Sequence, residues 1–279
     1  MSGNLDPRTL DGFGVEWSRF DQSQVPKEEL LRRFDDYFRI FPWDQLPYDA
    51  IGFDVGCGSG RWAAFVAERV GTLHCVDASA PALAVAQRTL AGRANCVFHL
   101  ASVDTLPFED ESMDFGYSLG VLHHLPDTAA GIADCVRKLK PGAPFLVYLY
   151  YAFDNRPAWY RALWQASDRL RRVISRMPDW AKLATADVIA ATVYWPLARA
   201  GRAVARVGLS AQTLPLFYYR DTSFETMRTD ALDRFGTLLE RRFTVAEIRR
   251  MMEAAGLEGI TFSDAAPYWC AVGAKRTCP

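Results

Sequence analysis

The chain has 279 residues, of which half are hydrophobic, and a formal net charge of −1. This length fits one large domain, or one domain that carries an insertion, and the composition allows a full apolar core. The near-neutral charge provides no general attraction to nucleic acid or to a membrane surface. No run of the sequence approaches the roughly 18 apolar residues that a membrane-spanning helix needs.

The N-terminal sequence MSGNLDPRTL lacks the basic and then apolar pattern of a secretory signal peptide. The six cysteines are scattered and include no CxxC pair. We therefore expect reduced, buried thiols and no metal site. Together these features predict a cytoplasmic protein.

Between residues 46 and 150, short β-like runs alternate with helical patterns. The apolar spacing predicts helices over 61–70, 81–90 and 128–140. Alternation of strands and helices at this spacing implies βαβ units and a parallel sheet that is covered on both faces. The predicted strands are 50–55, 72–77, 95–100, 113–119 and 145–151.

The pattern changes after the fifth strand. Residues 151–220 contain ten arginines and one lysine against four aspartates, and long helices are predicted over 158–177 and 184–207. A helix over 244–256 and strands over 257–264 and 268–276 then resume the α/β pattern. We therefore predict a Rossmann-like α/β fold with a seven-stranded, mostly parallel sheet and helices on both faces. Its four segments are an N-terminal cap or lid (1–45, helical from about 27), the α/β core (46–150), a mainly helical substrate-binding insertion (151–243) and the end of the core (244–279).

The clearest motif is FDVGCGSGRW at residues 53–62, between the first predicted strand and the first predicted helix. Glycines permit a tight turn and a close approach of the backbone to a ligand, and a helix N-terminus favours negative charge. A dinucleotide-binding fold requires GxGxxG, but Arg61 occupies the position of its third glycine, which argues against NAD. Asp77 ends the second strand, where a carboxylate can accept both hydroxyls of a ribose.

This motif, together with LPF at 106–108, GVLHH at 120–124 and LKPG at 139–142, resembles the class I S-adenosylmethionine-dependent methyltransferases, most closely their small-molecule group. The resemblance covers residues 48–150 and extends again over 244–276. It implies S-adenosylmethionine as cofactor and S-adenosylhomocysteine as product. The cofactor-binding residues that it implies are Asp54 near the methionine amino group, Gly56, Cys57, Gly58, Gly60 and Arg61 in the turn, Asp77 at the ribose, Ala78, Ser102 and Val103 around the adenine, Leu119 beside the methionine, and Trp17 in a lid.

Three of these implied roles have alternatives. Arg61 either pairs with the methionine carboxylate or lies on the surface, and Trp17 either covers the cofactor or anchors a terminal helix. The family often has an aspartate where this chain has Ser102. Either Ser102 or Asp104 is therefore expected to accept the hydrogen bond from the adenine amino group.

The residues expected around the acceptor are less specific. His123 and His124 follow the fourth strand, and each is either a base for a proton of the acceptor or a structural element of its loop. The basic and aromatic insertion suits an acceptor with an anionic group and a flat or apolar part, unless its arginines only cover apolar surface. The stretch 217–236 is either a binding loop or an ion-pair network. The candidate substrate-binding residues are Tyr150, Tyr218, Tyr219, Arg220, Arg228 and Arg234.

The leading hypothesis is methyl transfer to a small molecule, anionic or aromatic, by in-line displacement. A second hypothesis is methylation of a lipid or quinone at the membrane surface, with the arginine-rich helices at 159–176 and 187–207 in the headgroup region. A third is a protein that binds S-adenosylmethionine without transferring its methyl group. A nucleic-acid partner is not expected, because the core is acidic and no (D/N)PPY motif is present. A homodimer is compatible with the sequence.

Overall fold

The computed structural model describes residues 3–208 and 214–277 of the chain. The chain forms two compact units. The core unit comprises residues 1–18, 31–152 and 239–279, and the helical unit comprises residues 19–30 and 153–238. These bounds differ from the predicted segments, because residues 19–30 of the expected N-terminal cap belong to the helical unit.

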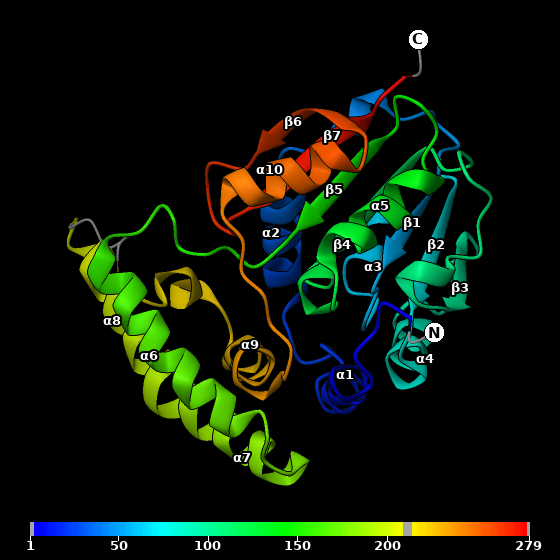
Figure 1. Cartoon of the computed structure of the whole chain (residues 1–279). Coiled ribbons are helices and arrows are strands. Elements are labelled where there is room, and N and C mark those ends of the chain that lie inside the picture. Colours follow the sequence, from blue (N-terminus) through cyan, green and yellow to red (C-terminus); the bar gives the residue numbers. More distant parts are fainter. Residues whose placement is uncertain (1–2, 209–213, 278–279) are drawn as a thin grey trace. The chain divides into compact units, whose positions relative to one another are not determined.

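The core unit is built on one seven-stranded sheet with the order β3-β2-β1-β4-β5-β7-β6 (Figure 1). Strands β1 to β5 pair in parallel, whereas β7 is antiparallel to both β5 and β6. This sheet confirms the predicted mostly parallel α/β fold. The strands are β1 (Ile51–Val55), β2 (Thr72–Asp77), β3 (Cys96–Leu100), β4 (Phe115–Leu119), β5 (Pro144–Tyr148), β6 (Leu257–Phe262) and β7 (Cys270–Lys275).

Side chains alternate between the two faces of the sheet along each strand. Helices pack against both faces. On one face, Phe53 of β1 shares a buried core with Ile132 of α5 (Thr128–Lys138) and Ile248 of α10 (Val245–Ala254). On the other face, Tyr117 of β4 packs against Phe38 of α2 (Lys27–Phe38), with ring centroids 5.2 Å apart. The strands of the parallel part therefore lie between two apolar layers.

The helices at the N-terminal side of the core differ from the sequence expectation. The sequence pattern predicts no helix before residue 27, yet α1 spans Pro7–Arg19. The predicted helix over 61–70 is short, since residues 58–62 remain in turns and bends and α3 spans only Ala63–Val66. The next helix, α4 (Ala80–Thr89), begins as predicted, with the Ser79 side chain capping it.

The helical unit contains α6 (Ala158–Ile174), α7 (Asp179–Ile189), a π-helical segment (Ala190–Tyr194), α8 (Trp195–Arg206), a 3-10 turn (Phe217–Asp221) and α9 (Phe224–Gly236). Its apolar core joins Met227 and Ala231 of α9 to Ala186 of α7 and Ala198 of α8. The stretch 217–236 is thus largely a helix rather than the loop that was one of its two expected forms.

Glu29 connects residues 19–30 to this unit. Its carboxylate accepts hydrogen bonds from the Ser223 backbone N–H at 2.8 Å and from the Thr226 hydroxyl at 2.6 Å. Ser223 in turn caps α9 by accepting from the Thr226 N–H at 3.3 Å. Since a capped helix start and a buried carboxylate stabilise each other here, the N-terminal segment and α9 form one packed group.

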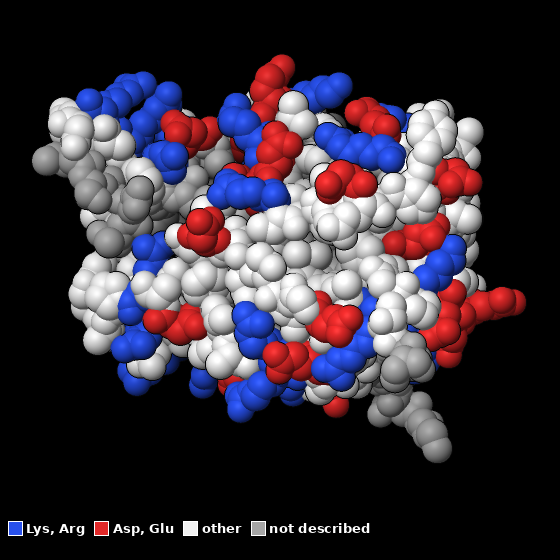
Figure 2. All heavy atoms as spheres, turned by 90° about the horizontal axis from the view of Figure 1, so that it is seen from above, with Lys and Arg blue, Asp and Glu red and all other residues white. Residues whose placement is uncertain are grey.

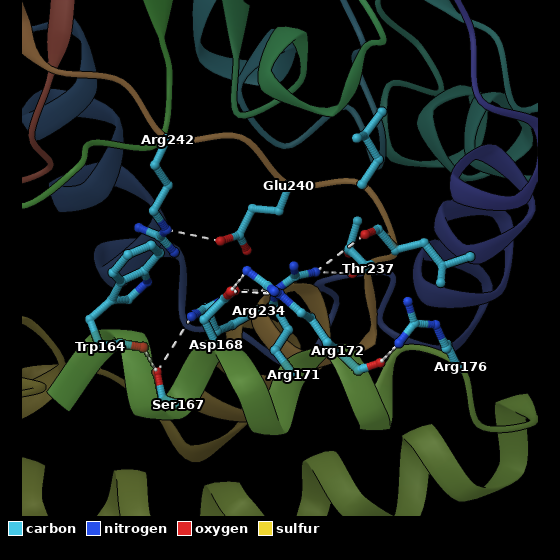
Figure 3. A network of polar contacts seen from close by, with 12 residues as sticks. Trp164, Ser167, Asp168, Arg171, Arg172, Arg176, Arg234, Thr237, Glu240 and Arg242 are labelled. Atoms are coloured by element: carbon cyan, nitrogen blue, oxygen red, sulfur yellow. Dashed lines mark hydrogen bonds and ion pairs between the residues drawn. The ribbon is translucent and has the colours of Figure 1, made fainter. Parts of the chain in front are cut away.

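An ion-pair cluster on α6 provides the polar interior of the helical unit (Figure 3). The buried carboxylate of Asp168 lies 2.7 Å from Nε of Arg171, 2.9 Å from Nη2 of Arg172 and 3.9 Å from Nη1 of Arg234. Arg171 also donates to the Thr237 carbonyl at 2.8 Å. Burial alone would raise the pKa of Asp168, but the hydrogen bond and charge of Arg171 and the other two guanidinium groups lower it.

No helix within the described ranges 3–208 and 214–277 is long and apolar enough to cross a bilayer. On the face of the molecule that Figure 2 shows, acidic and basic side chains are interspersed. This mixture agrees with the net charge of −1.

The close packing of the sheet yields a stability prediction. A Cβ atom at Gly52 of β1 would lie 2.2 Å from the Phe115 ring, so the Gly52→Ala variant must displace a buried aromatic side chain. We expect it to lower the free energy of unfolding by about 1–3 kcal/mol. Gly12→Ala is the matched control, because a Cβ there meets nothing within 4 Å and helix propensity predicts a gain of up to about 1 kcal/mol. Urea unfolding followed by tryptophan fluorescence compares the two, and equal midpoints would contradict the packing argument.

The Asp168 cluster yields a second stability prediction. Asp168→Asn leaves the Arg171 guanidinium buried without its counter-charge, and we expect a loss of about 3–5 kcal/mol. Asp179→Asn is the control, because Asp179 is 56% exposed and pairs with Lys182 at 3.2 Å, so its loss should cost under about 1 kcal/mol. The lowered pKa of Asp168 stabilises the folded state at neutral pH, and this contribution disappears as the pH falls through that pKa. Wild type should therefore lose its advantage over Asp168→Asn in acid, as unfolding curves at several pH values will show.

Candidate cofactor and acceptor site

The glycine turn lies directly after β1, at the carboxyl edge of the sheet. Gly56, Gly58 and Gly60 have φ angles of 77°, 54° and 75°, which L side chains rarely adopt. A Cβ atom at Gly56 would lie 2.3 Å from the Val121 side chain, and one at Gly58 would lie 2.9 Å from the Trp17 ring. Both the backbone conformation and the surrounding side chains therefore require glycine in this turn.

Asp77, at the end of β2, is held against the glycine turn. One carboxylate oxygen accepts from the Gly58 backbone N–H at 2.9 Å, and the other accepts from the Ser79 N–H at 2.8 Å. Burial raises the pKa of Asp77, although these backbone hydrogen bonds oppose the shift. The predicted ribose-binding carboxylate is thus fixed at the turn, with the half-buried Ala78 as its neighbour in sequence.

Asp54, one residue before the end of β1, is a second buried carboxylate at this edge. Burial raises its pKa to about 8; Tyr117 and Arg61 lower it, and Asp77 raises it further. Among the described residues, no hydrogen-bond partner meets the buried Oδ2 atom of Asp54. A buried acceptor without a donor fits the ammonium group of a methionine moiety, since the cation would satisfy it and favour its ionised form. These residues therefore fit S-adenosylmethionine.

Trp17 and Arg61 cover the turn. The guanidinium of Arg61 lies 5.1 Å from the centroid of the Trp17 ring and 4.7 Å from that of Trp62. Arginine between two aromatic rings is held by cation–π attraction. Trp17, on α1, is thus packed on Gly58 from one side and contacted by Arg61 from another, and these contacts fit both a lid residue and an anchor of the terminal helix. Cys57 is buried within the same turn, and the pKa of its thiol is raised to about 11.

The predicted adenine side is arranged around Ser102. Its hydroxyl lies 2.9 Å from the Thr105 hydroxyl. It also donates to the Asp104 carboxylate, and this hydrogen bond from Ser102 lowers the pKa of Asp104. Asp104 also accepts from the Asn4 backbone N–H at 3.0 Å. The two residues that were alternative adenine acceptors are therefore bonded to each other. Val103 between them is buried in the core behind β1.

The two histidines after β4 differ in their surroundings. Leu119 ends β4, and residues Leu122–His124 form a 3-10 turn. His124 donates from Nδ1 to the Leu239 carbonyl at 2.6 Å, so it is tied into the return of the chain from the insertion. His123 is fully buried, and in the described chain neither of its ring nitrogens has a hydrogen-bond partner. Burial, His124 and Arg242 together hold the pKa of His123 well below its usual value, so its ring is neutral.

A row of aromatic rings continues from His123. The His123 ring stacks on Tyr150 at 3.8 Å, Tyr150 lies 5.9 Å from Tyr148, and Tyr148 lies 5.1 Å from Tyr37. Tyr148 stands beside Gly120, 3.9 Å from where a Cβ atom would be. The row therefore follows the carboxyl ends of β4 and β5, where an acceptor would meet the methyl group.

Arg242 adds a buried cation to this row. Its guanidinium lies 5.0 Å from the centroid of the Tyr150 ring and donates from Nε to Glu240 at 2.8 Å (Figure 3). Sequence reasoning selected Tyr150 but missed Tyr37, Tyr148, Glu240 and Arg242. The run YLYY at 148–151 was a usable signal for Tyr148, because it ends the fifth strand. No local pattern distinguishes Arg242 from the other arginines of its region.

The other predicted substrate residues all belong to the helical unit, where most of them are bound to one another. Arg228 donates to both oxygens of Asp187 at 2.6 and 3.0 Å, and Arg234 belongs to the Asp168 cluster. Arg220 pairs with Asp221 at 3.2 Å. Tyr218 and Tyr219 contact each other with centroids 5.4 Å apart. These contacts form an ion-pair network within the helical unit, whereas the alternative interpretation of this stretch was a network that fixes the insertion to the core.

The described residues contain no group of three or more histidine, cysteine, aspartate or glutamate side chains that could hold a metal ion.

Comparison with known proteins agrees with this geometry. Residues 53–147 match a family model described as a methyltransferase domain. Phosphoethanolamine N-methyltransferase 2 of Caenorhabditis elegans is 33% identical over 125 residues, which are 44% of this chain and 26% of that protein. The chain thus spans about a quarter of the length of that relative.

Two solved structures share the fold. A SAM-dependent methyltransferase of Thermotoga maritima, described as a possible histamine N-methyltransferase, matches with a TM-score of 0.53 and 12% identity over 96% of this chain and 100% of that one. Phosphoethanolamine N-methyltransferase 2 of Haemonchus contortus, in complex with phosphomonomethylethanolamine and S-adenosylhomocysteine, matches with a TM-score of 0.50 and 16% identity over 93% of this chain and 44% of that one.

The sheet order, the glycine turn with its two carboxylates and the matched segment 53–147 agree with one another. Residues 53–147 form a methyltransferase domain, the fold is shared with solved S-adenosylmethionine-dependent methyltransferases, and S-adenosylmethionine is the cofactor that the residues of the turn fit.

Proposed function

We propose that this chain transfers a methyl group from S-adenosylmethionine to a small-molecule acceptor that carries an anionic group, an aromatic group or both. The observation that carries the proposal is the pair of carboxylates at the glycine turn, Asp54 fully buried and Asp77 half-buried and held by the Gly58 backbone N–H. A bound S-adenosylmethionine supplies an activated methyl group on a positively charged sulfur. The task left to the protein is to hold an acceptor atom in line with that methyl group and to exclude water, and orientation of this kind contributes about 7–11 kcal/mol.

The cofactor-binding roles follow from the contacts. Asp54 would accept a hydrogen bond from the methionine ammonium. Asp77 would accept hydrogen bonds from the ribose hydroxyls, either in place of its backbone donors or in addition to them. Trp17 would cover the turn, and Arg61 would stay against Trp17 while facing the methionine carboxylate. Ser102, Val103 and Ala78 would border the adenine, and Leu119 the methionine.

The acceptor end supports an anionic or aromatic substrate. Tyr148 and Tyr150 offer flat surfaces, and the Arg242 guanidinium against Tyr150 offers a positive charge. Charge-assisted hydrogen bonds from arginine suit carboxylate and phosphate groups. The Caenorhabditis relative is named for a phosphate-bearing amine, which agrees with such an acceptor. Tyr218, Tyr219, Arg220, Arg228 and Arg234 would act more indirectly, by fixing the shape of the helical unit.

His123 is the better of the two candidate bases. Because its pKa is held well below the usual value, its ring is neutral at physiological pH, and a ring nitrogen can accept a hydrogen bond from the acceptor. His124 would orient the loop through its bond to Leu239. A base is required only if the acceptor atom is a hydroxyl oxygen or an acidic carbon, where it contributes about 10²–10⁴-fold.

Binding and turnover separate this proposal from a protein that only binds the cofactor. Calorimetry with S-adenosylhomocysteine measures binding, and methyl-labelled S-adenosylmethionine with a panel of phosphate-bearing amines, carboxylates and phenols measures transfer. We expect Asp77→Asn to weaken S-adenosylhomocysteine binding by about 10- to 100-fold, because its charge-assisted hydrogen bonds are lost. Asp110→Asn, on the exposed surface beside Lys138, is the control and should bind normally.

Unchanged binding by Asp77→Asn would refute its assignment to the ribose. Tight binding of S-adenosylhomocysteine without transfer to any acceptor of the panel would instead favour the non-catalytic alternative.

The raised pKa of Asp54 yields a prediction of pH dependence. At pH 6 its carboxyl group is protonated in the free protein, since its pKa is about 8, and binding of the cofactor's ammonium requires its ionisation. The affinity for S-adenosylhomocysteine should therefore rise with pH by up to about tenfold per unit between pH 6 and 8, then level off. Asp54→Asn should lose this slope.

The titration of the ligand's own amino group is common to both proteins, so the difference between their curves isolates Asp54. The same pKa predicts that the unliganded wild type loses stability relative to Asp54→Asn as the pH rises from the ordinary value of 3.8 to about 8, and that the difference levels off above that pH. Parallel affinity curves for the two proteins would show that Asp54 does not meet the ammonium.

A further inference from the structure

Helix α6 of the helical unit buries two charged side chains and exposes a row of apolar ones. Asp168 and Arg171 are buried. Trp159, Leu163, Leu170 and Val173, in contrast, are each between 52% and 58% exposed. Their spacing of four, seven and three residues brings them to one side of a helix with 3.6 residues per turn. Together with the exposed Ala162 and Ala166 they form a continuous row, which we call the apolar stripe.

Exposed arginines border the apolar stripe, and their helix carries a single acidic residue. Arg161, Arg169, Arg172 and Arg176 are exposed on the same helix or directly after it. The sole acidic residue between 158 and 176 is Asp168, whose carboxylate is buried against Arg171 and Arg172. The exposed surface of α6 therefore combines an apolar row with net positive charge.

Apolar side chains are also exposed farther along the helical unit. Val193, Leu197 and Val207 are 42%, 43% and 72% exposed, in the π-helical segment, on α8 and directly after α8. Arg206 is exposed on α8 as well. Two helices of the same unit thus expose apolar residues in a region with ten arginines and one lysine against four aspartates over residues 151–220.

Exposed apolar patches of this kind mark sites that bind a protein or a membrane. A second copy of the chain fits poorly, because a symmetric contact through the apolar stripe would bring the arginines of one copy against those of the other. The surface of an anionic bilayer offers both an apolar phase and opposite charge. Helices with aromatic and aliphatic residues on one side and arginines on the other lie in such an interface.

We propose that the apolar stripe of α6 binds the surface of an anionic lipid bilayer, with its arginines at the headgroups. The proposal goes beyond methyl transfer and does not depend on it. It is a surface interaction, since no helix in the described part of the chain is long and apolar enough to span the bilayer.

The test is sedimentation of the full chain with vesicles of phosphatidylcholine alone or mixed equally with phosphatidylglycerol. Wild type should bind the mixed vesicles, and high salt should weaken the binding. The double variant Leu163→Glu and Leu170→Glu should bind at least about tenfold more weakly, because two apolar contacts are replaced by charges that anionic lipid repels. Leu31→Glu with Val97→Glu is the matched control: both residues are exposed in the core unit, at 40% and 39%, and the change in net charge is the same.

Calorimetry with S-adenosylhomocysteine checks that each variant is folded, and it separates this proposal from the proposed enzymatic function. Absence of wild-type binding to the mixed vesicles at low salt would overturn the membrane proposal. So would equal loss of vesicle binding in the stripe variant and in the control. If light scattering shows a wild-type dimer that the stripe variant alone converts to a monomer, and vesicle binding is unaffected, the stripe is a contact between copies of this chain instead.

Discussion

The backbone of residues 56–60 is the constraint on which the site depends. Three glycines there adopt positive φ angles, and the space that their missing side chains leave is occupied by Val121 and Trp17. The turn thereby brings together β1, the loop after β4 and the end of α1, which are far apart in the sequence. A side chain at Gly56 or Gly58 would be strained in itself and would also push these segments apart. The same glycine turn thus shapes the predicted cofactor site and holds Trp17 against it.

Electrostatics at this edge of the sheet favours a cationic ligand. Asp54 is buried and Asp77 is half-buried, and the charge of Asp77 raises the free energy of ionising Asp54. Backbone N–H groups compensate Asp77 in the free protein, whereas the Oδ2 atom of Asp54 has no such donor among the described residues. A ligand that brings an ammonium to Asp54 and hydroxyl donors to Asp77 would relieve both costs. The unliganded site therefore stores unfavourable free energy that a fitting cofactor removes.

Helix α6 departs from a usual amphipathic helix. Much of the inner side of α6 is charged, and its order depends on Asp168 holding Arg171 and Arg172. Its outer side is apolar, which in water costs free energy that folding does not recover. A partner surface that is both apolar and anionic would account for this distribution of side chains on α6. The stability of the unit and its proposed binding to lipid therefore involve different residues of α6.

The sequence by itself determined the fold class, the family and the position of the cofactor turn. These depend on local signals: period-two and period-3.6 apolar spacing, a capping serine before α4, and glycines where the backbone turns. It also reached Tyr150 and the two histidines, because they directly follow strands whose carboxyl ends share one edge. It did not predict α1, and it left the form of residues 217–236 open. Only the tertiary structure decided that α9 is a helix fixed by Glu29, that Arg228 binds Asp187, 41 residues away, and that Arg242 lies on Tyr150. Such partners are chosen by which surfaces meet once the chain is packed, and no spacing along the chain records that choice.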